Sequence, residues 1–336
     1  MDSLTHIAVG ACLGEAFLGQ RVGKKAMVWG MLAQSLPDID FIFTPFLEVS
    51  EDLLVHRGFS HSILFGLIMT PILAMTANRM HQPHDISLRR WLAFFACSIL
   101  LHDLLDGFNN YGIGWLEPFI HTRFSFNAIY VVDPFFSIGP GIAAAVLVLS
   151  GARYVKRKSW ALFGIGFIAL HLCYSTTLKL IVEEDVKEQL KAQKIGYDSH
   201  LTTPAPFQNL LWFVAAGNDS GFHVGYRSVL DTGKMPFVFF PRNESILIPY
   251  AGRDDLKRLK LFSQGFYTAS IHNDTLMFND LRFGQVIGWA SPEERFVFHY
   301  YLDYPDENDL VVQRGRFEKL NTISPWDYCS RALGSR

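Results

Sequence analysis

Residues 56–61 read His-Arg-Gly-Phe-Ser-His, and this stretch guides the interpretation of the rest of the chain. Two histidines five positions apart enclose an arginine, a glycine and a serine, and an apolar run, residues 62–78, follows at once. Ionisable side chains at membrane depth are costly and are usually functional. We therefore expect the stretch to lie at the mouth of a membrane helix. Gly58 would let the backbone bend so that both imidazoles face inward.

Apolar runs recur on both sides of this stretch. Hydrophobic residues make up 49% of the 336 residues and charged residues only 18%, against about a quarter in a usual soluble domain. Gly10 and Gly14 in the first run are spaced so that another helix can pack closely, and we expect Glu15 to pair with Arg21 or Lys24 just beyond it. The runs predict about six short transmembrane helices. They cover residues 4–19, 26–36, 62–78, 91–105, 131–150 and 160–182.

Basic loops indicate how these helices would be oriented. The loops at residues 21–25, 79–90 and 153–158 are rich in lysine and arginine, and they alternate with three loops that are not. The positive-inside rule places the basic loops in the cytoplasm. Both termini and the histidine-rich mouth would then lie on the periplasmic side of a bacterial inner membrane.

The composition changes after residue 183. The charged, amphipathic pattern of residues 183–194 predicts a helix that leaves the membrane. Alternating apolar residues predict strands near residues 221–226, 266–271 and 296–301, with a hairpin turn at 272–275. The predicted fold is therefore a membrane α-helical bundle followed by a β-rich, α+β extracytoplasmic domain. The expected divisions are a transmembrane metal-site domain at 1–182, an amphipathic helical linker at 183–199 and the extracytoplasmic domain at 200–336.

Charge and cysteine content exclude several classes of protein. A net charge of −2 and a pI near 6.6 argue against nucleic-acid binding, which needs a basic face. The four cysteines have neither the spacing of a disulfide framework nor that of a thiolate zinc site. No basic segment and cleavage site of a signal peptide are found at the start of the sequence. Because the cysteines do not form a thiolate site, any metal must be held by nitrogen and oxygen ligands.

Histidines and aspartates of suitable spacing gather on the predicted outer side. His102 and Asp106 are four apart, which places them on one face of a helix. Each pair also has an ordinary explanation, such as a helix cap or interfacial histidines, but their shared location favours a metal site. Such ligands suit one or two zinc ions, with manganese or iron as alternatives. The candidate ligands are His6, Asp38, Asp40, His56, His61, His102 and Asp106.

Arg57 lies within this set. A guanidinium beside a metal commonly binds a phosphoryl oxygen or stabilises transition-state charge. It can equally be an anchor for a lipid headgroup. An aspartate that is not a ligand, Asp38 or Asp40, is a candidate for the catalytic base.

The sequence resembles the YdjM-like family of inner-membrane proteins, which are regarded as metal-dependent hydrolases. Four segments carry the resemblance: Met-Asp-Ser-Leu-Thr-His at 1–6, Leu-Pro-Asp-Ile-Asp at 36–40, His-Arg-Gly-Phe-Ser-His-Ser at 56–62 and His-Asp-Leu-Leu-Asp at 102–106. The family pattern also extends to the Asp133-Pro134 pair and to residues 278–284. The family is distantly similar to zinc-dependent phospholipase C and P1-type nucleases.

This resemblance implies roles for individual residues. It implies that Asp40 and His61 are either ligands or side chains that orient ligands. The N-terminal tryptophan and the later histidine–glutamate ligand pair of the distant enzymes are not found here. The residues implied as metal ligands are His6, Asp38, His56, His102 and Asp106.

Taken together, the sequence predicts a membrane-bound metal-dependent hydrolase. A metal-activated water would cleave a phosphoester at the membrane surface, and the expected partners are a membrane lipid and a phospholipid or lipid-linked phosphate substrate. Two alternatives remain. One is a non-catalytic membrane scaffold with a structural metal site, which would be closed and four-coordinate. The other is a transporter component, which would place ionisable groups near the middle of its helices.

Overall fold

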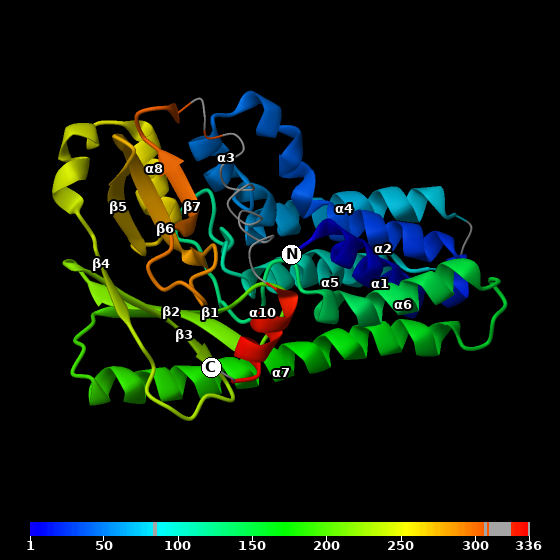
Figure 1. Cartoon of the computed structure of the whole chain (residues 1–336). Coiled ribbons are helices and arrows are strands. Elements are labelled where there is room, and N and C mark those ends of the chain that lie inside the picture. Colours follow the sequence, from blue (N-terminus) through cyan, green and yellow to red (C-terminus); the bar gives the residue numbers. More distant parts are fainter. Residues whose placement is uncertain (83–85, 306–307, 309–323, 335–336) are drawn as a thin grey trace. The chain divides into compact units, whose positions relative to one another are not determined.

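The computed structural model describes residues 1–82, 86–305, 308 and 324–334 (Figure 1). Residues 83–85 of the predicted basic loop and most of residues 306–323 lie outside the described part. The described residues form two compact units. Unit 1 comprises Met1–Leu47, Leu54–Phe126 and Val131–Tyr174, and unit 2 comprises Glu48–Leu53, Asn127–Tyr130 and Ser175–Arg336.

Unit 1 is helical. Each of the six predicted apolar runs forms an α-helix, which confirms where these helices lie along the chain. Between α2 and α4 the chain forms three short 3₁₀ helices, η1 (Pro37–Ile42), η2 (Thr44–Phe46) and η3 (Phe59–His61), and the short helix α3 (Val49–Val55). The longer helices are α1 (Ser3–Val22), α2 (Lys25–Ser35), α4 (Ile63–Met80), α5 (Leu88–Gly107), α6 (Pro134–Leu149) and α7 (Arg157–Ala192).

The prediction of about six membrane spans is not confirmed. Only α4 and α7 are both long and apolar enough to cross a membrane among the described residues. The 11 residues of α2 rise about 16 Å, half of the hydrocarbon thickness of a bilayer. Helix α6 is apolar but has only 16 residues. Helix α5 begins beside Arg89 and Arg90 and carries Asp103 and Asp106 near its end, so its composition is too polar.

Glycines allow α1 and α2 to approach closely, as their spacing predicts. A Cβ atom built on Gly10 would lie 2.3 Å from the carbonyl oxygen of Gly30, and one built on Gly30 would lie 1.8 Å from the carbonyl oxygen of Gly10. Gly14 meets the carbonyl oxygen of Ala26 in the same way, at 2.0 Å. A larger residue at any of these positions would separate the two backbones. This contact fixes the start of α1 beside the end of α2.

The basic loops gather at one end of unit 1. Lys24 donates to the carbonyl oxygen of Val148 at the end of α6, and Arg90 at the start of α5 donates to that of Phe17 near the end of α1. The starts of α1 and α4 and the ends of α2 and α5 therefore lie at the opposite end. That opposite end carries the predicted histidines and aspartates.

Glu15 pairs with a different residue from those expected. Its carboxylate accepts from Arg157 Nη2 at 2.6 Å and from Nε at 2.9 Å, and both side chains are buried. The prediction of Arg21 or Lys24 was based on nearness in sequence. The packing of α7 against α1 instead brings a residue 142 positions away into contact.

Unit 2 is a mixed domain of two antiparallel sheets, which confirms the predicted α+β, β-rich class. The hairpin predicted at residues 272–275 joins β5 to β6. Asn273 and Asp274 have φ angles of 49° and 58°, as a type I′ turn requires. One sheet has the order β1 (Ser199–Pro204), β2 (Leu211–Asn218), β3 (Gly221–Ser228), β4 (Val238–Pro241). The other has the order β5 (Tyr267–His272), β6 (Thr275–Gln285), β7 (Phe296–Tyr301). The described part of unit 2 also includes the helices α8 (Asp254–Phe262) and α10 (Pro325–Ala332) and the 3₁₀ helix η4 (Glu244–Tyr250).

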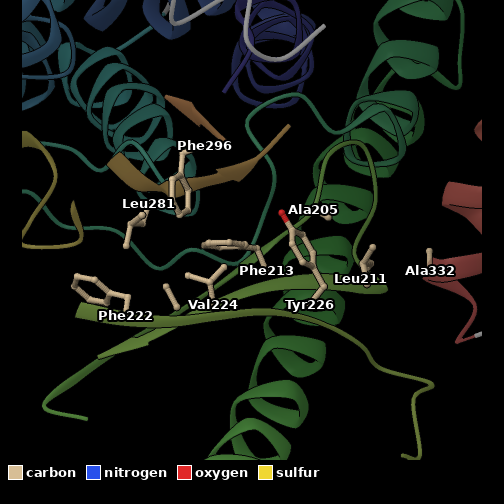
Figure 2. Packing of buried hydrophobic residues seen from close by; sticks show 10 residues of the cluster. Ala205, Leu211, Phe213, Phe222, Val224, Tyr226, Leu281, Phe296 and Ala332 are labelled. Carbon is tan, nitrogen blue, oxygen red and sulfur yellow. The ribbon is translucent and has the colours of Figure 1, made fainter. Parts of the chain in front are cut away.

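Strand β2 is buried on both of its faces. Trp212 and Val214 face the second half of α7, where Val182 and Val186 pack against them. Phe213, which alternates with them, lies in a core shared with the second sheet and α10 (Figure 2). Side chains of a strand alternate between its faces, so a nearly continuous apolar strand is the expected sequence for such a position. The members of the Figure 2 core include Leu211, Phe222, Val224, Tyr226, Leu281, Phe296 and Ala332.

Helix α7 belongs to both units and runs without a break through residue 182. Its first half carries the sixth apolar run, and its second half carries the predicted amphipathic helix. The predicted domain boundaries at residues 182 and 199 stay a prediction.

Candidate metal centre

Four of the predicted ligands converge where α2, α4 and α5 end or begin. Asp38 lies on η1 after α2, His61 lies just before α4, and His102 and Asp106 lie on one face of α5. One ligand atom from each of the four lies within 4.8 Å of the others. The histidines and Asp106 are fully buried, while the side chain of Asp38 is 11% exposed.

The separations of the four atoms suit a divalent cation. The distance between His61 Nε2 and His102 Nε2 is 3.1 Å. Asp38 Oδ1 lies 3.5 Å from His61 Nε2 and 3.6 Å from His102 Nε2, and Asp106 Oδ2 lies 3.5 Å and 3.9 Å from the same two atoms. Ligands about 2.0–2.1 Å from a tetrahedral zinc ion stand about 3.3 Å from one another. The side chains therefore fit a cation of this size with small adjustments.

Hydrogen bonds fix the ring tautomers of the two central histidines. His102 Nδ1 donates to the backbone carbonyl of Gln34 at 2.6 Å. Ser60 Oγ donates its proton to Asp40 Oδ2, so it accepts from His61 Nδ1, 3.1 Å away. In the neutral rings, both Nε2 atoms then carry lone pairs that face the cluster. Such hydrogen bonds are the usual means by which a protein orients metal-binding histidines.

Gln34 orients a third histidine. Its Nε2 donates to the carbonyl oxygen of Ser98 at 2.7 Å, which leaves its Oε1 to accept from His6 Nδ1 at 3.2 Å. His6 Nε2 then faces Asp106 Oδ1 at 3.1 Å. The ring of His6 also stacks on that of His102, with centroids 3.8 Å apart. His6 therefore borders the cluster on the side of Asp106.

The carboxylate oxygens and imidazole nitrogens of the cluster are electron-pair donors that face one another, and positive charge between them is favourable. Burial opposes the charged form of His61, but hydrogen bonds to Asp106 and Asp38 raise its pKa to about 9. A proton or a metal ion is thus strongly favoured among these carboxylates. Nitrogen and oxygen donors of this kind are those that zinc, manganese and ferrous iron bind.

Arg57 is turned toward Asp106 and is almost fully buried. Its Nε lies 2.9 Å from Asp106 Oδ2, and its Nη1 donates to Asn109 Oδ1 at 2.7 Å. The guanidinium also lies over the ring of Tyr111, 5.1 Å from the centroid. The Met1 amino group contacts the other oxygen of Asp106. Arg57 thus holds the carboxylate at the end of α5, and contact between Arg57 and a phosphoryl group stays a prediction.

Asp40 and His56 lie beside the cluster. Asp40 Oδ2 accepts from the backbone N–H of Arg57 at 2.8 Å and from Ser60 Oγ at 3.0 Å, and Asp40 Oδ1 accepts from His56 Nδ1 at 3.3 Å. Burial favours the neutral acid, but the hydrogen bond and charge of His56 hold the pKa of Asp40 below its usual value. Burial lowers the pKa of His56, and the hydrogen bond to Asp40 opposes this effect. Asp38 and Asp40 both lie on the 3₁₀ helix η1 and face different partners.

Several residues of the site were not predicted from the sequence. Gln34 and Asn109 form hydrogen bonds to His6 and Arg57, and Ser60 links His61 to Asp40. Asp103 is buried, and neither of its oxygens has a hydrogen-bond partner among the described residues. A polar glutamine within the apolar run 26–36 was the one available signal, because such a residue must find partners inside the protein.

The amino-acid sequence matches a protein family over the part that carries this cluster, and it is similar to two individual proteins. The pattern of the YdjM inner membrane protein family covers residues 1–182. Inner membrane protein YbcI of Escherichia coli strain K12 is 32% identical over 123 residues, which are 36% of this chain and 69% of the relative. Uncharacterized protein YfhP of Bacillus subtilis strain 168 is 25% identical over 273 residues, 76% of this chain and 77% of the relative. No solved structure matches.

The family match includes all four residues of the cluster together with His6, Asp40, His56 and Arg57. It also spans more than half of the 336 residues. The chain belongs to the YdjM inner membrane protein family.

Proposed function

We propose that the protein is a metal-dependent hydrolase of the inner membrane that cleaves a phosphoester. One or two divalent cations, zinc or else manganese or iron, would be held by Asp38, His61, His102 and Asp106, with His6 beside them. The convergence of four buried electron-pair donors, with lone pairs turned inward by hydrogen bonds, carries this proposal. A cation bound there supplies a Lewis acid that lowers the pKa of a water molecule.

The chain's own residues would fix that site in place. Arg57, itself held by Asn109, holds Asp106 at the end of α5, and Gln34 orients both His6 and His102. A preorganised set of this kind loses little energy to rearrangement during a reaction. Asp38, the most accessible of the four ligands, is the side from which a substrate would approach.

A lipid substrate is favoured by the surface beside the site. The chain that carries Asp38 and Asp40 continues into exposed apolar side chains, of which Phe46 is 84% exposed. We call residues 39–46 the apolar strip. Exposing such a strip to water costs free energy, whereas the interfacial region of a bilayer can bury its apolar side chains. Its exposed members are Ile39, Phe41, Ile42, Phe43 and Phe46.

The orientation of the site follows from the same positive-inside argument as before. The basic loops lie at the end of unit 1 opposite to the cluster. With these loops in the cytoplasm, the cluster would face the periplasm. The substrate would then be a phospholipid or lipid-linked phosphate of the outer leaflet.

A structural metal site in a membrane scaffold is the second candidate. It is favoured by the burial of three of the four ligands, because structural zinc sites are closed and four-coordinate. A transport site is less well supported, because the cluster stands at the ends of helices rather than at their middles. Turnover of a substrate separates the hydrolase from the scaffold.

The proposal is tested by metal content and turnover of the full chain, purified in detergent. We expect one or two equivalents of metal in the wild type by elemental mass spectrometry. His61→Ala should lose this metal, whereas His272→Ala, an exposed histidine of unit 2, should retain it. Wild type should release water-soluble phosphate ester from mixed micelles of phosphatidylethanolamine and phosphatidylglycerol.

The outcomes separate the candidates. Metal together with turnover that chelation abolishes supports the hydrolase. Metal without turnover on either the lipids or bis(4-nitrophenyl) phosphate leaves the scaffold as the better account. A wild type that binds no metal after reconstitution overturns both.

A further inference from the structure

His56 differs from the other histidines of the site in its surroundings. Its side chain is 19% exposed, whereas those of His61 and His102 are fully buried. It is absent from the set of four converging ligand atoms, although its ring centroid lies only 6.2 Å from that of His61. The imidazole therefore stands next to the cluster and is also open to the outside.

Asp40 fixes which nitrogen of His56 carries the proton. Its two oxygens accept from His56 Nδ1, the Arg57 backbone N–H and Ser60 Oγ, so three donors from residues 56–60 converge on this carboxylate. The proton of His56 is thereby held on Nδ1, and a lone pair is left on Nε2. A carboxylate that holds a histidine in this tautomer is the arrangement found behind catalytic imidazoles in hydrolases. With three donors on it, Asp40 itself is a poor base.

The backbone around His56 is held rigidly. Arg123 donates to the carbonyl oxygen of His56, and Gly114 N–H donates to that of Arg57 at 2.9 Å. Arg57 has a φ of 60°, an unfavourable value for a residue other than glycine that persists only where the surroundings impose it. Gly58 has no room for a side chain, since a Cβ there would lie 2.6 Å from the carbonyl oxygen of Leu54. Such rigidity is expected of a group that must be in place before a reaction begins.

An aromatic ring packs beside His56. Phe41, half exposed and part of the apolar strip, lies with its ring centroid 4.6 Å from that of His56. The imidazole thus stands between the metal cluster and the surface that we assign to lipid. A phosphoester held there would have His56 on one side and Asp38 on the other.

We propose that His56 is the catalytic base of the reaction rather than a metal ligand, and that Asp40 is its positioning residue. This inference rests on the proposed hydrolase function. As the oxygen of the attacking water forms its bond to phosphorus, the proton of that water passes to His56 Nε2. The bond from phosphorus to the ester oxygen breaks, and the leaving oxygen takes a proton from solvent. His56 releases its proton to solvent after the product leaves.

Metal content distinguishes a base from a ligand without any assay of activity. We expect His56→Ala to bind as much metal as the wild type, by elemental mass spectrometry, while the matched variant His61→Ala binds little. Thermal midpoints and elution volumes near those of the wild type would show that both variants fold. A His56→Ala protein that folds but loses metal as His61→Ala does would overturn the assignment.

Kinetics with bis(4-nitrophenyl) phosphate as the probe test the proton transfer itself. His56→Ala should lower kcat by about 10²–10⁴-fold with KM little changed, and added imidazole should restore part of kcat. Asp40→Asn should lower kcat less than His56→Ala, because it disturbs the tautomer of His56 but leaves the imidazole in place. An unchanged kcat in His56→Ala, or a loss that imidazole does not rescue, would contradict the role.

Failure of the hydrolase function gives a different pattern. If the metal-loaded wild type has no turnover, both the proposed hydrolase function and the assignment of His56 as its base are wrong. If the wild type turns over while folded His56→Ala loses its metal or keeps full kcat, only the role of His56 fails.

Discussion

Single residues of the cluster are held by neighbours that are not themselves ligands. Gln34 illustrates this, since one side chain and its backbone carbonyl serve His6 and His102 together. Asn109 binds Arg57, and Arg57 in turn faces the carboxylate of Asp106. Changes at these supporting residues should alter the site without removing a ligand.

At Gln34, replacement by leucine should weaken metal binding about 10–100-fold, the usual effect of losing a side chain that orients a ligand. Its amide would no longer fix His6, although the backbone carbonyl bound by His102 remains. Affinity can be measured by competition with a fluorescent zinc chelator. Gln20→Leu, at an exposed position of α1, is the matched control and should leave affinity unchanged. Equal affinities for both variants would show that Gln34 does not orient the site.

At Arg57, replacement by methionine should lower the free energy of unfolding by about 3–5 kcal/mol, because it removes one of the charged partners of the buried Asp106 carboxylate. Thermal or denaturant unfolding of the full chain gives this value. Arg79→Met removes an exposed arginine of α4 and should cost about 0.5 kcal/mol or less. A cost for Arg57→Met as small as that for Arg79→Met would contradict the ion pair.

At the scale of elements, the pairing of α1 with α2 sets the spacing of the site. The contact between Gly10 and Gly30 is a backbone-to-backbone contact, so it tolerates no side chain. His6 extends from one of these helices and Gln34 from the other. The distance between His6 and the rest of the cluster therefore depends on two glycines that are not part of the cluster.

Gly30→Ala should accordingly destabilise unit 1 by about 1–3 kcal/mol, the usual cost of forcing extra atoms into a packed interface. It should also weaken metal binding. Gly141→Ala in α6, where a Cβ would meet nothing within 4 Å, should be neutral or stabilising. Unfolding midpoints and chelator competition on the two variants check both statements. Equal unfolding midpoints and metal affinities for the two variants would show that the interface between α1 and α2 can accommodate a methyl group.

At the scale of the whole molecule, the orientation in the membrane is open to direct measurement. Cys329 is exposed on α10, so in a background with Cys12, Cys97 and Cys173 replaced by alanine it is a single label site. We expect a membrane-impermeant maleimide to label Cys329 in intact spheroplasts. Lys156→Cys, in the basic loop before α7, should react only after permeabilisation. The reverse pattern would place the cluster on the cytoplasmic side.

The sequence by itself determined where the helices of unit 1 and several strands of unit 2 lie, because apolar periodicity and turn residues act over a few positions. It also predicted the residue types of the cluster, although their role as ligands stays a prediction. It overestimated the number of membrane spans, because several of the apolar runs form helices that are too short or too polar to cross a bilayer.

Only the tertiary structure decided which side chains meet. It paired Glu15 with Arg157 and Arg57 with Asp106, and it brought His61 rather than His56 into the cluster. These contacts join residues up to 142 positions apart. They depend on the depth and rotation at which packed helices come together, and no short stretch of sequence encodes that register.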